Sequence, residues 1–373
     1  MTRLRRTRDY ALVKNALKKL RPGGSPWPGP LDDTEYSPKL ALDTLTMAWP
    51  DAVPKPVIGL VRDVDVYPYW TKYRRFLDAN DIPYELYDIH RSDWRRRAEG
   101  MDLILWRPMS FPYETEECRR KFWVLEHYLD KLCYPTFREA QIYEDKVLQG
   151  ELLKHYGLPV VPTFISHSEE ESLAYVRACE YPAVWKIACG SGSWGVELVR
   201  SRAAAQRRVR SVFSFQGRQT YWPYRAQKNY ILLQQLEHNA GYDLRVIVVG
   251  DHIQGYYRAV PRGEFRASGM NTWYYGELPV EAMRLACRVR DRLGLTMLAL
   301  DLLADPAEQR FSIIEVSIFT QINDDFELEV AGVPGAYIHC GEEFRFEPAK
   351  IVLQDLVVRE LLTTRWIAPR LSA

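Results

Sequence analysis

The chain has 373 residues, of which 47% are hydrophobic and 27% are charged. This is the composition of a soluble globular protein with room for two or three domains. Fifty basic and 49 acidic side chains leave a net charge of +1, which gives no global field for nucleic acid or a membrane surface, so we expect neither as a partner. A basic arm at the amino terminus is the local exception, and a solvated tail is its more ordinary explanation.

Cysteines and histidines suggest no metal or disulfide framework. The six cysteines form no CxxC pair, and the seven histidines form no HxxxH or HExxH pattern. The sequence also shows no apolar region typical of a signal peptide and no apolar run of membrane-spanning length. We therefore expect a cytoplasmic protein with reduced thiols.

The first half of the chain predicts an arm and an α/β domain. Residues 1–55 combine a short basic helix with the proline- and glycine-rich stretch RPGGSPWPGP, which disfavours regular structure. From residue 56 to 137, strands at 57–64, 84–89 and 102–108 alternate with helices, including 70–81 and 113–132. Strands and helices that alternate in this way predict a parallel sheet.

Two further blocks follow, at 138–228 and 229–373. The central block is expected to open with one long helix over 138–157, ended by Gly157 and Pro159. A strand at 160–166, a helix at 168–180 and a strand at 183–189 come next. The last block has antiparallel signals, with strands at 229–236, 244–250, 252–260, 298–304 and 311–318 and a helix at 280–294. The predicted class is α/β (α+β).

The stretch CGSGSWG places Gly190, Gly192 and Gly195 in a G-x-G-x-x-G pattern. A dinucleotide site needs a helix after this pattern, whereas a strand-like segment follows here. The glycines are therefore expected at the tip of a strand–loop–strand, where backbone N–H groups can close over phosphates. Lys186, on the entering strand, is well placed for those phosphates. A plain flexible hairpin is the alternative for this stretch taken alone.

Two carboxylates lie in otherwise apolar strands. If the strands around Asp301 and Glu315 form a hairpin, positions equidistant from residue 308 face each other, so the two become cross-strand partners. Ser317 then shares a face with Glu315. Paired carboxylates repel unless a proton or cation lies between them, and oxygen ligands suit Mg²⁺ that carries phosphates. The alternative is that one carboxylate faces solvent or pairs with an arginine.

Five segments resemble, in chain order, the motifs of the ATP-grasp superfamily. They are EDKVLQGELLKHYGLPVVPTF, PAVWKIACGSGSWGVELV, ILLQQLEHNAGYDLRVIVVGD, GEFRASG and LALDLLADPAEQRFSIIEVS. The nearest group looks like the ribosomal-protein glutamate ligases, with the D-alanine–D-alanine ligases and glutathione synthetases. The resemblance covers about residues 138–330 and implies an ATP-grasp fold. Residues 56–137 would form the preceding pre-ATP-grasp domain, 138–228 the central domain and 229–373 the C-terminal domain.

The resemblance also implies a nucleotide site with named residues. ATP would lie between the central and C-terminal domains with Mg²⁺, or alternatively Mn²⁺, on its phosphates. The implied cofactor contacts are Lys146 and Lys186 on the phosphates, Ser191, Gly192, Ser193 and Gly195 in the flap, Gln234, Gln235 and Leu236 at the adenine hinge, Asp243 on the ribose and Arg266 near the phosphates. Lys186, Arg258 and Arg266 would be the catalytic side chains, and Asp301, Glu315 and Ser317 the metal ligands.

Two positions depart from the family pattern. The family's E-x-N reads Glu315-Val316-Ser317 here, and its FR-x-N has Ser268 in the last place. A serine hydroxyl is a weaker and shorter ligand than an amide carbonyl. Asn323 or Asp324 could compensate if the chain folds back.

The implied activity is an ATP-dependent carboxylate–amine ligase that forms an amide or peptide bond through an acyl phosphate and releases ADP and phosphate. A phosphotransferase or carboxylate–thiol ligase on the same fold is the alternative, as is a nucleotide-binding module without turnover. The expected substrates are small or peptide-like carboxylates and amines, with no prediction of oligomeric state. Arg62, Asp63, Asp65 and Arg107 lie at strand ends of the first block, where ligands bind, although surface ion pairing is the more ordinary role. The aromatic segment 219–230 is expected to pack between domains rather than to line a groove.

Overall fold

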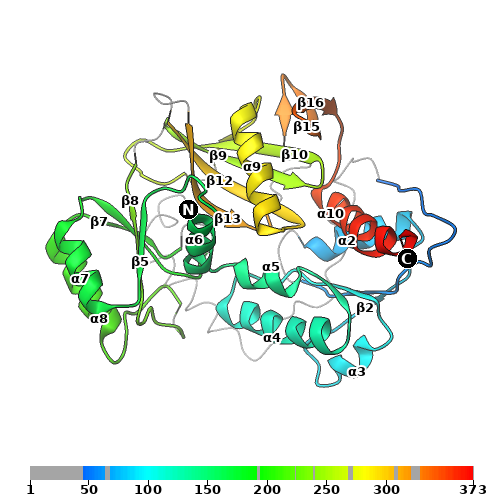
Figure 1. Ribbon diagram of the computed structural model, residues 1–373, viewed down its shortest axis with the longest axis horizontal. Helices are drawn as coiled ribbons and strands as arrows, with labels where there is room; N and C mark the ends of the chain where they lie inside the picture. The colour runs from blue at the N-terminus through cyan, green and yellow to red at the C-terminus, as the bar shows by residue number, and fades with distance from the viewer. Residues whose placement is uncertain are drawn as a thin grey trace, which may run out of the picture. The chain divides into compact units, whose positions relative to one another are not determined.

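The computed structural model describes residues 45–63, 68–190, 194–222, 224–237, 240–267, 272–305, 310–320 and 328–372. These residues belong to a single compact unit that spans 39–373. Three sheets organise the described chain, with helices between their strands (Figure 1). The predicted α/β class with one parallel and further antiparallel sheets is confirmed. The basic arm lies outside the described residues as far as residue 44.

The first sheet is parallel, as predicted, with the strand order β2-β1-β3-β4. Its strands are β1 (Ile58–Leu60), β2 (Tyr84–Leu86), β3 (Leu103–Leu105) and β4 (Leu132–Tyr134), connected through α2 (Tyr69–Ala79), α3 (Trp94–Ala98) and α4 (Pro112–Tyr128). β1 and β3 are buried at every position, as expected for central strands of a parallel sheet that helices cover on both faces.

The second sheet is antiparallel and has the order β5-β8-β6-β7. Its strands are β5 (Thr163–Ser166), β6 (Ala183–Lys186), β7 (Val196–Val199) and β8 (Ile231–Gln235). The helices α7 (Glu169–Ala178) and α8 (Arg202–Phe213) share one apolar cluster with β6 and β8, and Figure 1 shows them side by side. The sequence did not predict α8. It also placed β8 at the beginning of the third block, whereas β8 pairs with strands of the second.

The third sheet has the most strands, and its strand pairs within the described residues are antiparallel. Its main order is β13-β12-β9-β10-β15-β14. The strands are β9 (Tyr242–Val249), β10 (His252–Ala259), β11 (Trp273–Tyr274), β12 (Met297–Asp305), β13 (Arg310–Ser317), β14 (Glu329–Val330), β15 (Val333–Cys340) and β16 (Glu343–Pro348). The predicted turn at Gly250–Asp251 is confirmed. α9 (Val280–Leu293) crosses the sheet in Figure 1 and ends at Gly294 in the left-handed conformation that glycine favours. α10 (Leu353–Leu361) continues into a π-helical turn, Leu362–Ile367, and α11 (Ala368–Leu371).

One predicted helix is wrong. The pattern over 138–157 predicted a single helix, but the chain forms α5 (Phe137–Ile142) and α6 (Lys146–His155). Glu144, between them, has φ +55°, which no α-helix accommodates. The Asp145 side chain accepts a hydrogen bond from the Leu148 N–H and begins the second helix. The predicted end at Gly157 is confirmed, with φ +61°.

The end of β13 runs into the core of the first sheet. The ring of Phe319 packs edge-on against Tyr69, Tyr134 and Tyr143, with centroids 5.1 to 5.7 Å apart. The Tyr134 hydroxyl donates to the Ile318 carbonyl, and the Tyr69 hydroxyl bonds both the N–H and the carbonyl of Thr320. The segment that follows Glu315 is thereby held by tyrosine side chains of α2, of β4 and of the residue that follows α5.

Candidate nucleotide and ligase site

One candidate site is a pocket of about 770 Å³, including its open mouth, between strands of the second and third sheets. The predicted site residues that line it are Lys186, Gln234, Gln235, Leu236, Asp243, Arg258, Arg266, Asp301 and Glu315. Residues from four of the five sequence motifs therefore meet at one place. Lys146 and Ser317 are not among its lining residues, and Ser191, Gly192 and Ser193 lie outside the described residues.

Asp301 lies in a buried network of two carboxylates and two arginines. Arg245 binds both of its oxygens, at 2.7 and 2.9 Å, and Arg258 approaches at 2.8 Å. Arg258 also donates to Asp243 at 2.5 Å. Burial opposes the charge of Asp301, but the two arginines outweigh it and hold its pKa below the usual range. Burial raises the pKa of Asp243 to about 6, although Arg258 acts in the other direction.

Arg245 is a residue that the sequence analysis missed. Asp243 and Arg245 lie two positions apart on β9, so their side chains share one face, and Arg245 is the cross-strand partner of Asp301. The alternation within GYDLRV was the signal that could have revealed it. The alternative considered for Asp301, an arginine partner, is what the structure shows.

Glu315 faces Asp301 directly across the β12–β13 ladder, which confirms the predicted pairing, although a bulge shifts the register from Leu302 onward. Its carboxylate has a different partner, the Lys146 ammonium on α6, at 2.8 Å. Burial disfavours the charge of Lys146, but Glu315 and Glu144 outweigh it and raise its pKa above the ordinary value. The predicted metal carboxylates are thus adjacent and separately paired.

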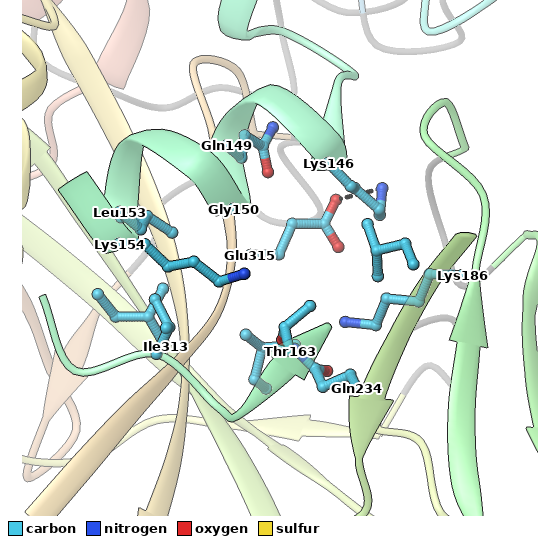
Figure 2. Close-up of a pocket in the computed structure, with 13 residues that line it drawn as sticks. Lys146, Gln149, Gly150, Leu153, Lys154, Thr163, Lys186, Gln234, Ile313 and Glu315 are labelled. Carbon is cyan, nitrogen blue, oxygen red and sulfur yellow. Dashed lines mark hydrogen bonds and ion pairs between the residues drawn. The ribbon is translucent and has the colours of Figure 1, made fainter. Parts of the chain in front are cut away.

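A smaller pocket of about 410 Å³ adjoins the first, and the two share Lys186, Gln234, Ile314 and Glu315. Lys146 lines this second pocket. Figure 2 shows Lys154 of α6 and Lys186 of β6 extending toward Glu315 from two sides, with Lys146 bound to it. Glu315 is therefore the anionic centre of a group of lysines at the junction of the two pockets.

Lys186 lies on the last position of β6 and is buried. Burial lowers the pKa of its ammonium to about 8. No carboxylate of the described residues lies within ion-pair distance of it. A poorly solvated cation that faces a pocket is suited to an anionic ligand such as a phosphate.

Arg266 also lines the larger pocket, where its guanidinium stacks over Phe265 and lies 3.8 Å from Glu264. Its Nε is buried without a hydrogen-bond partner. The hinge residues Gln234 to Leu236 form another wall. Polar walls with incompletely used donors fit a ligand that carries acceptor oxygens.

The two arms of the glycine stretch pair as the sequence predicted. β6 and β7 are antiparallel, and the Ile187 N–H donates to the Gly195 carbonyl at 3.3 Å. Gly195 has φ +77°, and a Cβ there would lie 2.4 Å from the Ile187 side chain. Only glycine fits this position, which does not line the pocket, whereas Gly190 does.

Ser317 bonds to its own strand end. Its hydroxyl donates to the Phe319 carbonyl at 2.6 Å and accepts from the Phe319 N–H at 3.3 Å. Its predicted place as a metal ligand stays a prediction. Ser268, Asn323 and Asp324 lie outside the described residues.

The candidate substrate contacts in the first block are largely structural. Asp63 accepts hydrogen bonds from the Tyr69 and Trp70 N–H groups at the start of α2, and Arg107 stacks over Tyr69. Arg62 is exposed and Asp65 lies outside the described residues. Within the aromatic segment, Trp222 packs against Phe111 of the first block, in agreement with the predicted packing role.

The residues present fit ATP and Mg²⁺, but not a metal held by protein alone. Within the described ranges no three His, Cys, Asp or Glu side chains are grouped so that they could hold an ion. Asp301 and Glu315 offer carboxylate oxygens beside cations that could receive phosphates. Mg²⁺ commonly binds one or two carboxylates together with substrate phosphates, which matches this donor set.

A family model for the RimK-like ATP-grasp domain matches residues 143–331. The chain belongs to this ATP-grasp family. It is thus an ATP-grasp protein of the ligase type, as the sequence motifs predicted. No curated protein sequence matches significantly.

Three solved structures are similar to this chain at low identity, and two of them, with TM-scores of 0.52 and 0.50, share its fold. The ATP-grasp ligase PsnB complexed with minimal precursor has a TM-score of 0.52 and 13% identity, over 83% of this chain and 99% of that one. A RiPP-associated ATP-grasp ligase from Chryseobacterium gregarium, in complex with ADP and a leader and core peptide, has a TM-score of 0.50 and 13% identity, over 71% and 90%. A RimK domain ATP-grasp protein from Sphaerobacter thermophilus has a TM-score of 0.49 and 17% identity, over 71% and 92%.

The described helices contain no segment with both the length and the apolar character that a membrane crossing requires.

Proposed function

We propose that this protein is an ATP-dependent carboxylate–amine ligase that forms an amide or peptide bond through an acyl phosphate. The observation that carries the proposal is the convergence of Lys186, Arg258 and Arg266 with Asp301 and Glu315 on one pocket. Cations that can bind phosphate oxygens and carboxylates that can share a metal are the parts that phosphoryl transfer requires.

In the first step, a carboxylate oxygen of the substrate attacks the γ-phosphorus of ATP, and ADP leaves. Lys186 and Arg266 would bind and orient the phosphates and neutralise the charge that builds on the transferring oxygens. Asp301 and Glu315 would hold Mg²⁺, which supplies further charge neutralisation when bound. In the second step, an amine attacks the acyl carbon, loses a proton and displaces phosphate.

The buried arginines have a supporting role in this scheme. Arg245 is the cross-strand partner of Asp301 and fixes the orientation of its carboxylate with two hydrogen bonds. Arg258 spans Asp243 and Asp301 and can turn to a substrate anion only by giving up one of them. Asp243, at the pocket wall, would accept from a ribose hydroxyl.

We further propose a peptide-like substrate. Two structures with this fold are ligases complexed with a precursor or with a leader and core peptide. Tyr113 and Tyr224 here are more than half exposed and form a tilted pair beside the Cys189–Gly190 segment, to which Trp222 is hydrogen-bonded. Aromatic rings of this kind offer rigid contact area to a peptide.

The test is a screen for phosphate and ADP release from ATP with Mg²⁺, using amino acids and short peptides as paired carboxylates and amines. We expect release that depends on both partners, with an amide product found by mass spectrometry. Glu315→Gln is the inactive reference. ATP turnover without an amine-dependent product would favour a phosphotransferase, and ADP binding without turnover for any pair would contradict the ligase.

A further inference from the structure

Glu144 is a residue whose position lowers the stability of the fold, and the proposed reaction assigns it no role. It lies in the three-residue break between α5 and α6, with φ +55°, a backbone conformation in which residues other than glycine and asparagine are strained. Burial raises the pKa of its carboxyl group to about 7, although the charge of Lys146 opposes this. A strained backbone and a poorly solvated carboxyl group both lower stability, and such costs are concentrated at functional sites.

The Glu144 carboxylate holds one residue at the entrance of the glycine stretch. It accepts a hydrogen bond from the Gly190 N–H at 3.1 Å. Two residues further along the chain, the Lys146 ammonium donates to the carbonyl of the same Gly190 at 2.7 Å. Glu144, just before α6, and Lys146, its first residue, thus form hydrogen bonds with both polar backbone groups of Gly190.

These two hydrogen bonds belong to a larger set of contacts on residues 188–190, which follow β6. The Lys146 N–H donates to the Ala188 carbonyl at 3.0 Å, and the Tyr230 hydroxyl accepts from the Ala188 N–H at 2.8 Å. A Cβ at Gly190 would lie 2.4 Å from the Trp194 carbonyl oxygen. The backbone of Gly190 is therefore confined from several sides, with Glu144 as its acidic contact.

We propose that Glu144 is a positioning residue for the nucleotide site, which acts by orienting Gly190 so that its carbonyl fixes the Lys146 ammonium between Gly190 and Glu315. Lys146 touches Glu315 at 2.8 Å and Gly190 at 2.7 Å at the same time. Its position therefore depends on where the Gly190 carbonyl lies. The inference rests on the proposed role of Lys146 as a phosphate contact.

The experiment measures ADP binding with Mg²⁺ by calorimetry, and thermal melting, for variants of the full chain. Glu144→Ala and Glu144→Gly both remove the acceptor, and the glycine also relieves the strained φ. We expect each to weaken ADP binding about tenfold, with no fall in melting temperature for Glu144→Gly. Glu144→Gln keeps an acceptor for the Gly190 N–H and is expected to bind ADP within about threefold of wild type.

Asp130→Gly is the matched control, because Asp130 also has a positive φ, of 50°, but is exposed and lines neither pocket. It should raise the melting temperature and leave ADP binding unchanged. Normal ADP binding by Glu144→Ala and Glu144→Gly would overturn the inference, as would a Glu144→Gln variant as weak as Glu144→Ala. If the Glu144 variants bind ADP normally, Lys146→Met separates two explanations. Normal ADP binding by Lys146→Met means that the proposed role of Lys146 has failed, whereas weak binding means that only the proposed role of Glu144 has failed.

Discussion

Asp301 and Glu315 face each other across the β12–β13 ladder, yet each carboxylate has its own cationic partners. Arg245 and Arg258 bind Asp301, while Lys146 binds Glu315. These cations offset the repulsion between the two neighbouring carboxylates.

Asp301→Asn is expected to lower the free energy of unfolding by about 3–5 kcal/mol, because it leaves two buried arginines without their carboxylate. Urea denaturation followed by circular dichroism measures the change. Asp305→Asn on the same strand is the control, since its pairing with Arg310 at 3.7 Å is at the surface and should contribute about 0–1 kcal/mol. Equal losses in the two variants would contradict the buried network.

Glu315→Gln is expected to abolish ADP formation, because it removes the carboxylate that would share Mg²⁺ with the phosphates. A coupled assay of ADP release at several Mg²⁺ concentrations measures it. Ser317→Asn restores the family pattern and is expected to keep activity or to lower the Mg²⁺ concentration needed. Full activity in Glu315→Gln would show that the metal assignment is wrong, and an inactive Ser317→Asn would point to the Phe319 hydrogen bonds as the role of Ser317.

The lowered pKa of Lys186 predicts a pH dependence of stability. Its pKa is about 8 in the folded protein and near 10.5 when unfolded, so between these values the unfolded chain binds more protons. Stability from this group therefore rises with pH from about 8 to 10.5, by at most about 1.4 kcal/mol per pH unit. Unfolding at pH 7.5, 8.5 and 9.5 should show a slope that Lys186→Met lacks. Lys154→Met, an exposed lysine of the adjoining pocket, should follow the wild type.

Phe319→Ala is expected to cost about 3–5 kcal/mol of stability, because it empties the space among three tyrosine rings. It should also weaken ADP binding, since Glu315 lies only four residues earlier on the same segment. Phe215→Ala is the control, because Phe215 is 93% exposed and its loss should change neither quantity. Unaltered ADP binding in a destabilised Phe319→Ala variant would show that the packing of Phe319 against the tyrosines does not affect the nucleotide site.

The sequence predicted the pairing of Asp301 with Glu315 correctly because the alternation of side chains leaves a hairpin around residue 308 few options. It did not predict the bulge that shifts the register between Asp301 and Leu302. The same alternation on β9 indicated Arg245, but a basic residue between apolar ones was not matched to a partner 56 residues later in the sequence. Pairings between distant segments cannot be seen in a local pattern, and the assignment of β8 to the second sheet is a further example.

The break between α5 and α6 escaped prediction for a different reason. The helical pattern continues through it, and only cap signals mark the interruption. Thr136 and Glu139 form a capping box at the start of α5, and Asp145 caps α6. Glu144, the left-handed residue between them, is stabilised by its hydrogen bond with Gly190, 46 residues later. Helix propensities describe only local sequence and cannot reveal such a contact.

The packing of Phe319 against three tyrosines also limits how this chain can be shortened to a single domain. The family match begins at residue 143, which invites a shortened version that starts there. Such a fragment would lack Tyr69 and Tyr134, two of the three rings around Phe319 and the hydroxyls that hold Ile318 and Thr320. The first sheet is therefore no exchangeable module: swapping it between relatives would require the end of β13 to be exchanged with it.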